Sequence, residues 1–424
     1  MKNFFNKIFF RTHNLDFISQ NIKNLSKSTP VDKIFNAINF FSSDSEIRYV
    51  GGCIRKILVQ QKVDDIDLAT NLEPIQVCEA LKKNKINYYE SGIEHGTITA
   101  QEDKYKFEIT SLRMDISTDG RHAKVEFSKD WRADASRRDF TINAIYSDRE
   151  GNLFDPYEGK KDLENGLINF IGDTDKRIKE DYLRILRYIR FFLNHSKKPH
   201  NLKTISILKK NIGSIAKISK ERLFDELKKT LKVDILEKLT KDKLSLDLLL
   251  TIFPELKNIK IFSKLNEEKK NLLKEKDFIF LLSLMIIDET DNVDYFLFKY
   301  NISKKNQKRI KIIDNFYKEK INLKTFSKIN MNKFFYYHGR EAVLDILNYR
   351  MIKSKKVENS LKELIKYYKN IEPLKMPVSA ELLMNKYEIP EGKKLGQKLR
   401  IIEEEWVENN FQISDKQVEN IVNS

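Results

Sequence analysis

Three aspartates stand within four positions of a basic chain: Asp64, Asp65 and Asp67, in the stretch "GGCIRKILVQQKVDDIDLAT" at residues 51–70. Alternation along a strand would place Asp65 and Asp67 on one face, with Ile66 and Leu68 on the other. Two neighbouring carboxylates repel, and without a cation one of them tends to take up a proton. Mg²⁺ removes this conflict, because it is a hard ion that binds carboxylates, water and substrate phosphates. Taken alone, the pattern also fits a solvated strand end with incidental acids.

A third carboxylate and a glycine turn favour the metal site. Glu108 lies on the polar face of another predicted strand, "KYKFEITSLR". It could complete a three-carboxylate site for two metal ions about 3.5–4 Å apart, the arrangement used for nucleotidyl transfer. Gly51 and Gly52 follow a strand and precede a helix, where backbone N–H groups can approach a phosphate closely. By themselves, two adjacent glycines also fit an ordinary turn.

The elements that must position these residues follow from the distribution of glycine. Nine of the 13 glycines lie between Gly51 and Gly172, and only Gly213 and Gly339 occur from residue 173 to residue 391. Strands and turns need glycine, whereas long helices avoid it. The sequence therefore predicts an α+β protein, with an N-terminal mixed-sheet head followed by an all-helical neck, body and tail.

Local patterns agree with this division. Strands are predicted within "EIRYVGG", "DDIDLAT", "KYKFEITSLR" and "FTINAIYSD", and a strand with its turn within "LFDPYEG". Apolar residues recur at helical spacing in "KEDYLRILRYIRFFLNHS", residues 179–196. Ser219 is a predicted N-cap of the next helix. The predicted domains are residues 1–172 (the head, with an N-terminal amphipathic helix), 173–250 (a helical neck) and 251–424 (a helical body and tail).

Composition bounds the class of partner and the compartment. The 424 residues include 78 Lys and Arg against 62 Asp and Glu, a formal net charge of +16. Such a surplus favours a polyanionic partner, most often nucleic acid, although a lysine-rich surface that only aids solubility fits too. No apolar run approaches the length of a membrane span, so no membrane partner is expected. Cys53 and Cys78 give no disulfide framework and no zinc spacing, which favours a reducing, cytoplasmic setting.

Five ordered motifs resemble the class II tRNA nucleotidyltransferases, a family of CCA-adding enzymes and bacterial poly(A) polymerases within the polymerase-β-like superfamily. The motifs are "GGCIRK…DDIDLAT", "EITSLRMDISTDGRHAKVEF", "RRDFTINAIY" at 137–146, "EDYLRILRYIRF" at 180–191 and "ISKERLFDELKKTL". The resemblance is strong over residues 46–230 and weaker beyond. One position departs from the family pattern: Lys56 follows Arg55, where the family usually has an acid.

The resemblance implies a role for each motif. Asp65 and Asp67 would hold Mg²⁺ on the triphosphate, and Glu108 would help to activate the primer hydroxyl. The triphosphate and ribose would be held by Gly51, Gly52, Arg55, Arg138, Asp139 and Asn143. The flexible loop with Asp115, Asp119 and Arg121 resembles the segment that family members use when they switch to ATP, which argues for terminal A addition.

Base choice would belong to the motif at 180–191. Asp181 and Arg184 are three residues apart and would share a helical face, which Arg187 and Arg190 continue. A carboxylate accepts from the amino group of cytosine or adenine, and it would repel the carbonyl of uracil or guanine. An Asp–Arg pair that only stabilises the helix is the alternative for these two residues taken alone.

The expected function is template-independent addition of CCA to the tRNA 3′ end, from CTP and ATP, with tRNA gripped by its acceptor arm. Poly(A) synthesis and A addition alone are alternatives within the family. An antibiotic adenylyltransferase is disfavoured by the large basic helical half, and a non-catalytic RNA-binding protein by the presence of Asp65, Asp67 and Glu108. Residues 301–330 carry nine Lys and Arg against two Asp and Glu, a candidate RNA surface.

Overall fold

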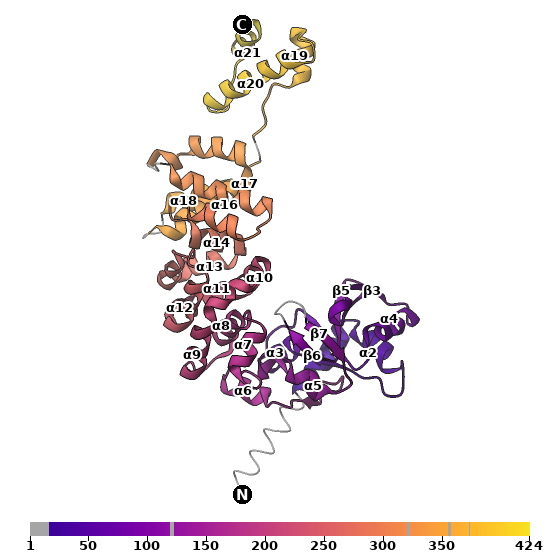
Figure 1. The fold of residues 1–424 in the computed structure, drawn as a ribbon. Coiled ribbons are helices and arrows are strands. Elements are labelled where there is room, and N and C mark those ends of the chain that lie inside the picture. Colours follow the sequence, from indigo (N-terminus) through magenta and orange to yellow (C-terminus); the bar gives the residue numbers. More distant parts are fainter. Residues whose placement is uncertain (1–16, 119–122, 320–322, 355–357, 373) are drawn as a thin grey trace. The chain divides into compact units, whose positions relative to one another are not determined.

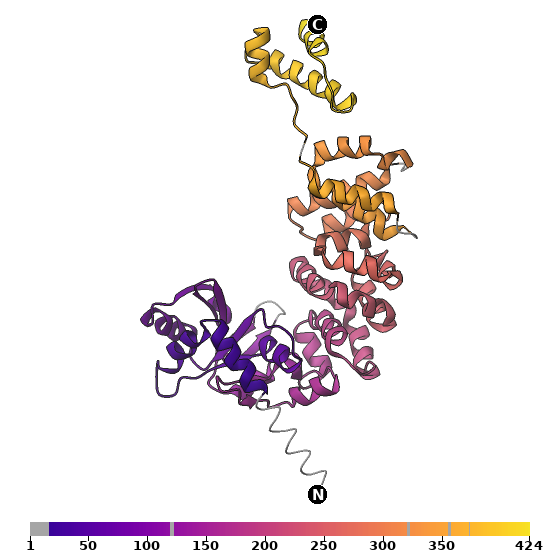
Figure 2. The same cartoon turned by 180° about the vertical axis from the view of Figure 1, so that it is seen from behind.

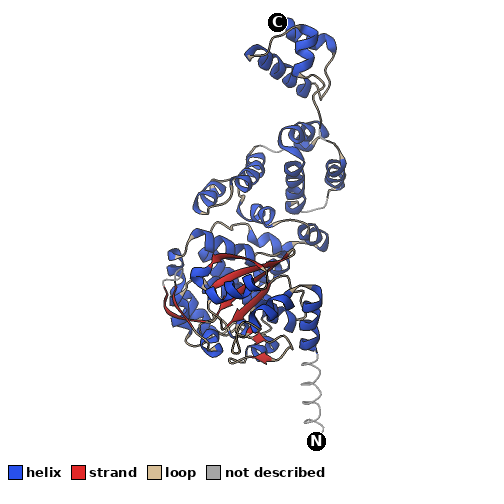
Figure 3. Ribbon diagram, turned by 90° about the vertical axis from the view of Figure 1, so that its right-hand side faces the viewer, coloured by secondary structure: helices blue, strands red, loops and turns tan. Residues whose placement is uncertain are grey.

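The computed structural model describes residues 17–118, 123–319, 323–354, 358–372 and 374–424. The chain forms two compact units, Met1–Ile252 and Phe253–Ser424. Within the described residues every strand belongs to the first unit, and the second unit is helical (Figure 3). The predicted α+β class, with a mixed-sheet head followed by helices, is confirmed. The further division at residue 172 stays a prediction, and the helix expected for the first ten residues lies outside the described part.

A seven-stranded mixed sheet forms the centre of the first unit. The strands β2 (Ile66–Thr70) and β5 (Tyr105–Ser111) run parallel, and the other neighbours run antiparallel. Asp67 of β2 is the register partner of Glu108 of β5. In spatial order the strands are β3 (Asn87–Gly92), β4 (Thr97–Glu102), β5 (Tyr105–Ser111), β2 (Ile66–Thr70), β1 (Ile47–Val50), β8 (Tyr146–Ser147) and β9 (Leu153–Phe154). A separate hairpin consists of β6 (Arg113–Thr118) and β7 (Ala123–Phe127).

Side chains on the two faces of this sheet enter different cores. Leu68 packs in a large core with α2 (Val31–Asn39), α3 (Gly52–Leu58) and α4 (Pro74–Lys83). The next residue, Ala69, packs in a smaller core on the other face, beside α5 (Trp131–Ser136). Because side chains alternate along a strand, Asp67 lies on the same face as Ala69. Burying Ile66 and Leu68 thus directs Asp67 away from the main core.

Helices complete the first unit. Residues 17–28 are helical and precede α2. After the sheet come α6 (Gly159–Asn165), α7 (Thr174–Glu180), α8 (Arg184–His195), α9 (Leu202–Asn211), α10 (Lys220–Thr230), α11 (Val233–Lys241) and α12 (Lys243–Ile252). Short 3-10 turns are η1 (Ile93–His95), η2 (Thr141–Asn143) and η3 (Ile212–Lys217). Ser219 caps α10 as predicted, accepting a hydrogen bond from the Arg222 backbone.

The second unit contains no strand among its described residues (Figures 1 and 2). A core between α17 (Lys328–Lys353) and α18 (Asn359–Asn370) is separate from the core of the last three helices. The elements are η4 (Ile259–Lys264), α13 (Glu267–Lys274), α14 (Phe278–Ile286), α15 (Asn292–Lys299), α16 (Lys304–Lys318), η5 (Leu323–Phe326), α17 (Lys328–Lys353), α18 (Asn359–Asn370), α19 (Ala380–Tyr387), α20 (Lys393–Glu408) and α21 (Asp415–Asn423). Every helix in the described residues is too short or too polar to cross a lipid bilayer.

Two predicted elements differ from the structure. The continuous helix expected over 179–196 is broken, because Asp181 has extended backbone angles (φ −152°, ψ 105°) between α7 and α8. Asp181 and Arg184 therefore do not share one helical face. "FTINAIYSD" contains the turn η2, and only its residues Tyr146 and Ser147 form a strand. The strand β2 begins at Ile66, so Asp65 immediately precedes it.

Candidate active site

A cavity of about 400 Å³ in the first unit brings most of the predicted nucleotide-binding residues together. Six arginines and three aspartates line it, which gives the wall a net charge of +3. Such a surface suits a polyanion. The predicted residues in the wall are Gly51, Gly52, Arg55, Asp67, Arg138, Asp139, Asn143, Asp181, Arg184, Arg187 and Arg190. Three residues that were not predicted line the cavity as well: Leu183, Phe191 and Arg222.

The glycine turn places the beginning of α3 against the carboxylate of Asp67. Gly51 has φ +64°, which favours glycine. A Cβ on Gly52 would lie 3.3 Å from Asp67 Oδ2, so a side chain there would crowd the carboxylate. Two consecutive glycines thus leave the backbone of the first turn of α3 open to a ligand.

The three predicted catalytic carboxylates interact, although only Asp67 lines the cavity. Burial raises the pKa of Asp67, and the neighbouring charge of Glu108 raises it further, with a smaller contribution from Asp65. Arg138 and Arg55 oppose the increase. Within the described residues, no group of three or more His, Cys, Asp or Glu side chains is arranged to hold a metal ion. The expected three-carboxylate cluster is therefore not formed by the side chains alone.

Arg55 and Arg187 are held by one network across the cavity wall. Arg55 donates to Asn143 Oδ1, Asn143 Nδ2 donates to Asp139 Oδ1 over 2.8 Å, and Arg187 Nε donates to Asp139 Oδ2 over 2.6 Å. Burial would raise the pKa of Asp139, but the charge and hydrogen bond of Arg187 more than offset it, so this pKa lies well below its usual range. Asp139 therefore stays ionised. It orients Arg187 directly, and it orients Arg55 through Asn143.

Arg138 is positioned by a carboxylate that lies outside the cavity. Asp134 is 1% exposed and binds the guanidinium groups of Arg137 (2.6 Å) and Arg138 (3.1 Å). It also accepts a hydrogen bond of 2.7 Å from the Tyr146 hydroxyl. Burial works against the ionised carboxylate, but these arginines lower the pKa of Asp134 to about 2. Asp134 and Tyr146 thus fix the direction in which Arg138 faces the cavity.

The carboxylate of Asp181 is engaged on both oxygens. Oδ1 accepts from the Leu183 backbone N–H (3.1 Å) and Oδ2 from Arg222 (2.7 Å), which comes from α10. Arg184 donates to Glu180 Oε2 and to the Arg177 carbonyl, each over 2.6 Å. The pair predicted to read the base is therefore held by a turn and by a distant helix.

The departure at Lys56 has a structural counterpart. Lys56 Nζ lies 3.1 Å from Asp64 Oδ2. The pair is partly solvated, so it contributes little to the free energy of unfolding. This ion pair connects Asp64, the residue before Asp65, to α3.

Comparison with known proteins places the chain in a family. The family model "Poly A polymerase head domain" matches residues 47–169, and "Probable RNA and SrmB- binding site of polymerase A" matches residues 202–260. The CCA-adding enzyme of Listeria innocua is 30% identical over 315 residues, 72% of this chain and 74% of that enzyme. The chain belongs to the CCA-adding enzyme family.

Two further relatives show how much of the chain each comparison covers. The human mitochondrial CCA tRNA nucleotidyltransferase 1 is 45% identical over 195 residues, 45% of either chain. This chain spans less than half the length of the vertebrate relatives that it matches. A crystal structure of the Bacillus stearothermophilus CCA-adding enzyme with CTP has the same fold, with a TM-score of 0.65 at 21% identity over 89% of this chain and 91% of that one.

The residues that the motifs did not reveal act through side-chain partners. Phe191 packs beneath the cavity, with the guanidinium carbons of Arg190 and Arg55 at 4.2 Å and 4.8 Å from its ring centroid. Arg222 lies inside one of the five motifs and Asp134 lies three residues before another, but no local pattern indicated their partners. In the flexible loop, Asp115 belongs to β6, and Asp119 and Arg121 lie outside the described residues.

The carboxylate of Asp67 and its acidic neighbours fit a divalent cation. Nucleotidyltransferases of this family use a divalent metal. Mg²⁺ typically takes one or two protein carboxylates and completes its shell with water and substrate phosphates. A cation beside Asp67 would stabilise its ionised form, because it would oppose the burial and the neighbouring acids that raise the pKa of this carboxyl.

Proposed function

We propose that this protein adds CCA to the 3′ end of tRNA without a template, using CTP, ATP and Mg²⁺. The observation that carries the proposal is the cavity in which Asp67, the glycine turn and six arginines meet Asp181. Family membership supports it, as do structures of the same fold described with CTP, with ATP and with a primer tRNA. The product pyrophosphate would leave from the arginine-lined wall.

The residues of the chain would divide the work as follows. Arg55, Arg138 and Arg187 would hold the triphosphate, since their directions are already set by Asn143, Asp134 and Asp139. Preoriented guanidinium groups stabilise charge that develops on the phosphates without reorganisation. Asp65 and Asp67 would hold Mg²⁺, which when bound lowers the pKa of the attacking hydroxyl and neutralises phosphate charge. Glu108 would help to take up the proton from that hydroxyl.

Base choice would depend on Asp181 and Arg184. The amino group of cytosine or adenine would share or displace the hydrogen bond from Arg222 to Asp181. A carbonyl at that position would face the carboxylate and be rejected. Loop residues Asp115, Asp119 and Arg121 would support the change from C to A addition.

The test uses tRNA transcripts that end before CCA, at C or at CC, each supplied with one labelled nucleoside triphosphate. CCA addition predicts incorporation of C, C and A followed by a stop. Use of ATP alone with continued growth would identify a poly(A) polymerase, and A incorporation only on the CC-ended transcript would identify an A-adding enzyme. No incorporation on any transcript would contradict the proposal.

The compartment is a separate proposal. We keep the cytoplasmic location as a prediction, supported by two cysteines that are buried and free. The human relative is named as mitochondrial. Microscopy of the tagged full-length protein against markers of both compartments decides between them.

A further inference from the structure

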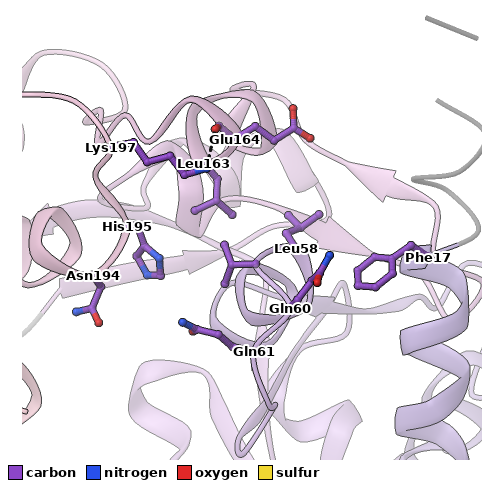
Figure 4. A pocket seen from close by; sticks show the side chains of 10 residues that line it. Phe17, Leu58, Gln60, Gln61, Leu163, Glu164, Asn194, His195 and Lys197 are labelled. Carbon is purple, nitrogen blue, oxygen red and sulfur yellow. Dashed lines mark hydrogen bonds between the residues drawn. The ribbon is translucent and has the colours of Figure 1, made fainter. Parts of the chain in front are cut away.

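A second cavity, of about 710 Å³, lies in the first unit and shares two helices with the nucleotide cavity. Arg55 of α3 lines the nucleotide cavity, whereas Leu58, one turn later, lines the second one. On α8, Phe191 lines the first cavity. His195, one turn later, lines the second (Figure 4). The volume falls within the range of about 300–1,000 Å³ that is typical of small-molecule sites.

The wall of this second cavity combines polar side chains that have hydrogen-bonding atoms to spare with aromatic and apolar side chains. Figure 4 shows the Gln60 amide between Leu58 and Phe17, whereas the His195 ring lies beside Asn194 on the opposite side of the cavity. Within the described residues, the side chains of Gln60, Gln61 and His195 make no hydrogen bond. Asn194 donates to the Arg190 carbonyl (2.7 Å), which leaves its own carbonyl oxygen to accept. These groups are available to a ligand with both donors and acceptors.

The charges around this cavity disfavour an anion. Three helices, α3, α6 and α8, end at its wall, and the carbonyl ends of helices carry partial negative charge. Lys197 Nζ already donates to the Glu164 carbonyl over 3.2 Å. Burial, together with the charges of Arg55 and Arg190, lowers the pKa of His195 to about 3, so its ring is neutral at pH 7. A neutral ligand fits this wall better than a phosphate does.

We propose that this cavity binds a neutral, amino-bearing nucleobase, stacked against the ring of Phe17 or His195 and hydrogen-bonded by the amides of Gln60, Gln61 and Asn194. Glutamine and asparagine amides pair with the edges of bases that carry an amino group next to a ring acceptor. Proteins that hold unstacked bases combine such contacts with aromatic stacking. The base can belong to a free nucleoside or to an unpaired nucleotide of RNA, and both sources present the same chemistry.

The first measurement is equilibrium dialysis of labelled adenosine with the full-length protein, in the presence of saturating CTP and Mg²⁺ to fill the nucleotide cavity. One equivalent of adenosine is expected to stay bound, and uridine, which lacks the amino group, should bind at least about tenfold more weakly. Gln61→Trp fills the cavity from its exposed edge and should reduce adenosine binding by tenfold or more. The matched control is Gln397→Trp, an exposed position in the second unit, which should leave binding unchanged.

A second arm separates the two sources of the base. If the cavity serves RNA, a tRNA transcript should displace labelled adenosine, and Gln61→Trp should weaken tRNA binding. If it serves a free nucleoside, tRNA should leave the adenosine bound. The proposal is overturned if CTP displaces all bound adenosine, or if Gln61→Trp, shown to be folded by its thermal unfolding curve, changes neither adenosine nor tRNA affinity. CCA addition by Gln61→Trp is measured alongside, so failure here stays distinct from failure of the proposed function.

Discussion

Asp67 differs from its two neighbours in the crowded acidic stretch, because it alone of the three lines the nucleotide cavity. Burial and the charge of Glu108 raise its pKa. Asp67→Asn keeps the shape of the side chain and removes its charge. We expect nucleotide incorporation to fall by about 100-fold or more, since a bound metal supplies several kcal/mol of stabilisation in the transition state.

The matched control for this substitution is Asp64→Asn. The side chain of Asp64 is 61% exposed and its carboxylate pairs with Lys56. Asp64 does not line the nucleotide cavity. Incorporation should therefore stay within a few-fold of the unmodified protein. Equal losses in the two variants, measured on the same CC-ended transcript, would argue against a special role for Asp67.

Asp134 allows a prediction about pH. The pKa of Asp134 in the folded protein is about 2, below the value of about 3.9 for an unfolded chain. The carboxylate therefore contributes stability that is present above about pH 4 and is lost as the pH falls towards 2. Asp134→Asn should lower the free energy of unfolding by on the order of 2 kcal/mol at pH 7.

Urea unfolding at pH 7 and near pH 3 measures this effect. The difference between Asp134→Asn and the unmodified protein should shrink at the lower pH. The variant should also raise the KM for the nucleotide, because Arg138 loses the partner that orients it. A stability difference that does not change with pH would show that the carboxylate charge is not what the site requires.

At the scale of elements, the sequence predicted the strands β2 and β5 because alternation is a local property, but it did not predict β3 or β4. Tyr105, Phe107 and Ile109 turn towards the core, and Lys106 and Glu108 turn away, as the pattern indicated. The break between α7 and α8 was missed for the opposite reason. Apolar periodicity continues on either side of Asp181, and the groups that stabilise the break include Arg222, 41 residues later. Contacts at that separation leave no periodic signal.

This turn carries the prediction for base choice. Asp181→Ala should raise the use of UTP relative to CTP by about 10- to 100-fold, since a base-reading contact is worth about 1–3 kcal/mol of discrimination. Arg222→Gln should act in the same direction with a smaller effect, because the Leu183 N–H still holds the other oxygen of Asp181.

Competition between labelled CTP and UTP on one transcript gives the ratio directly. Lys229→Gln, at an exposed position of the same helix α10, is the control and should not change it. If Arg222→Gln leaves the ratio unchanged while Asp181→Ala alters it, Arg222 supports only the fold and does not position Asp181.

For the whole molecule, the sequence predicted class and partner because glycine content and net charge are sums over many residues. Side-chain partners depend on single contacts, and so Asp134 with Arg138, or Lys56 with Asp64, emerged only from the structure. The candidate RNA surface at 301–330 was predicted from summed charge, but the contacts of single lysines decide how much of that charge is available. Lys304, Lys305 and Lys308 of α16 are exposed and form no ion pair with any described residue. Lys311 and Lys318 pair with Asp294, so less of their charge is available to RNA.

The charge of these three free lysines leads to a prediction on salt dependence. If they neutralise phosphates, tRNA binding should weaken steeply with salt, and the slope of log K against log[salt] should fall by about 0.7–0.9 for each lysine that no longer neutralises a phosphate. The variant Lys304→Gln/Lys305→Gln/Lys308→Gln should therefore bind more weakly at low salt and show a shallower slope.

The control, Lys82→Gln/Lys83→Gln/Lys85→Gln, removes the same charge from an exposed region around the end of α4. Filter binding across salt concentrations distinguishes the two surfaces: equal slopes in both variants would mean that only the net charge of +16 matters, and not its position on α16.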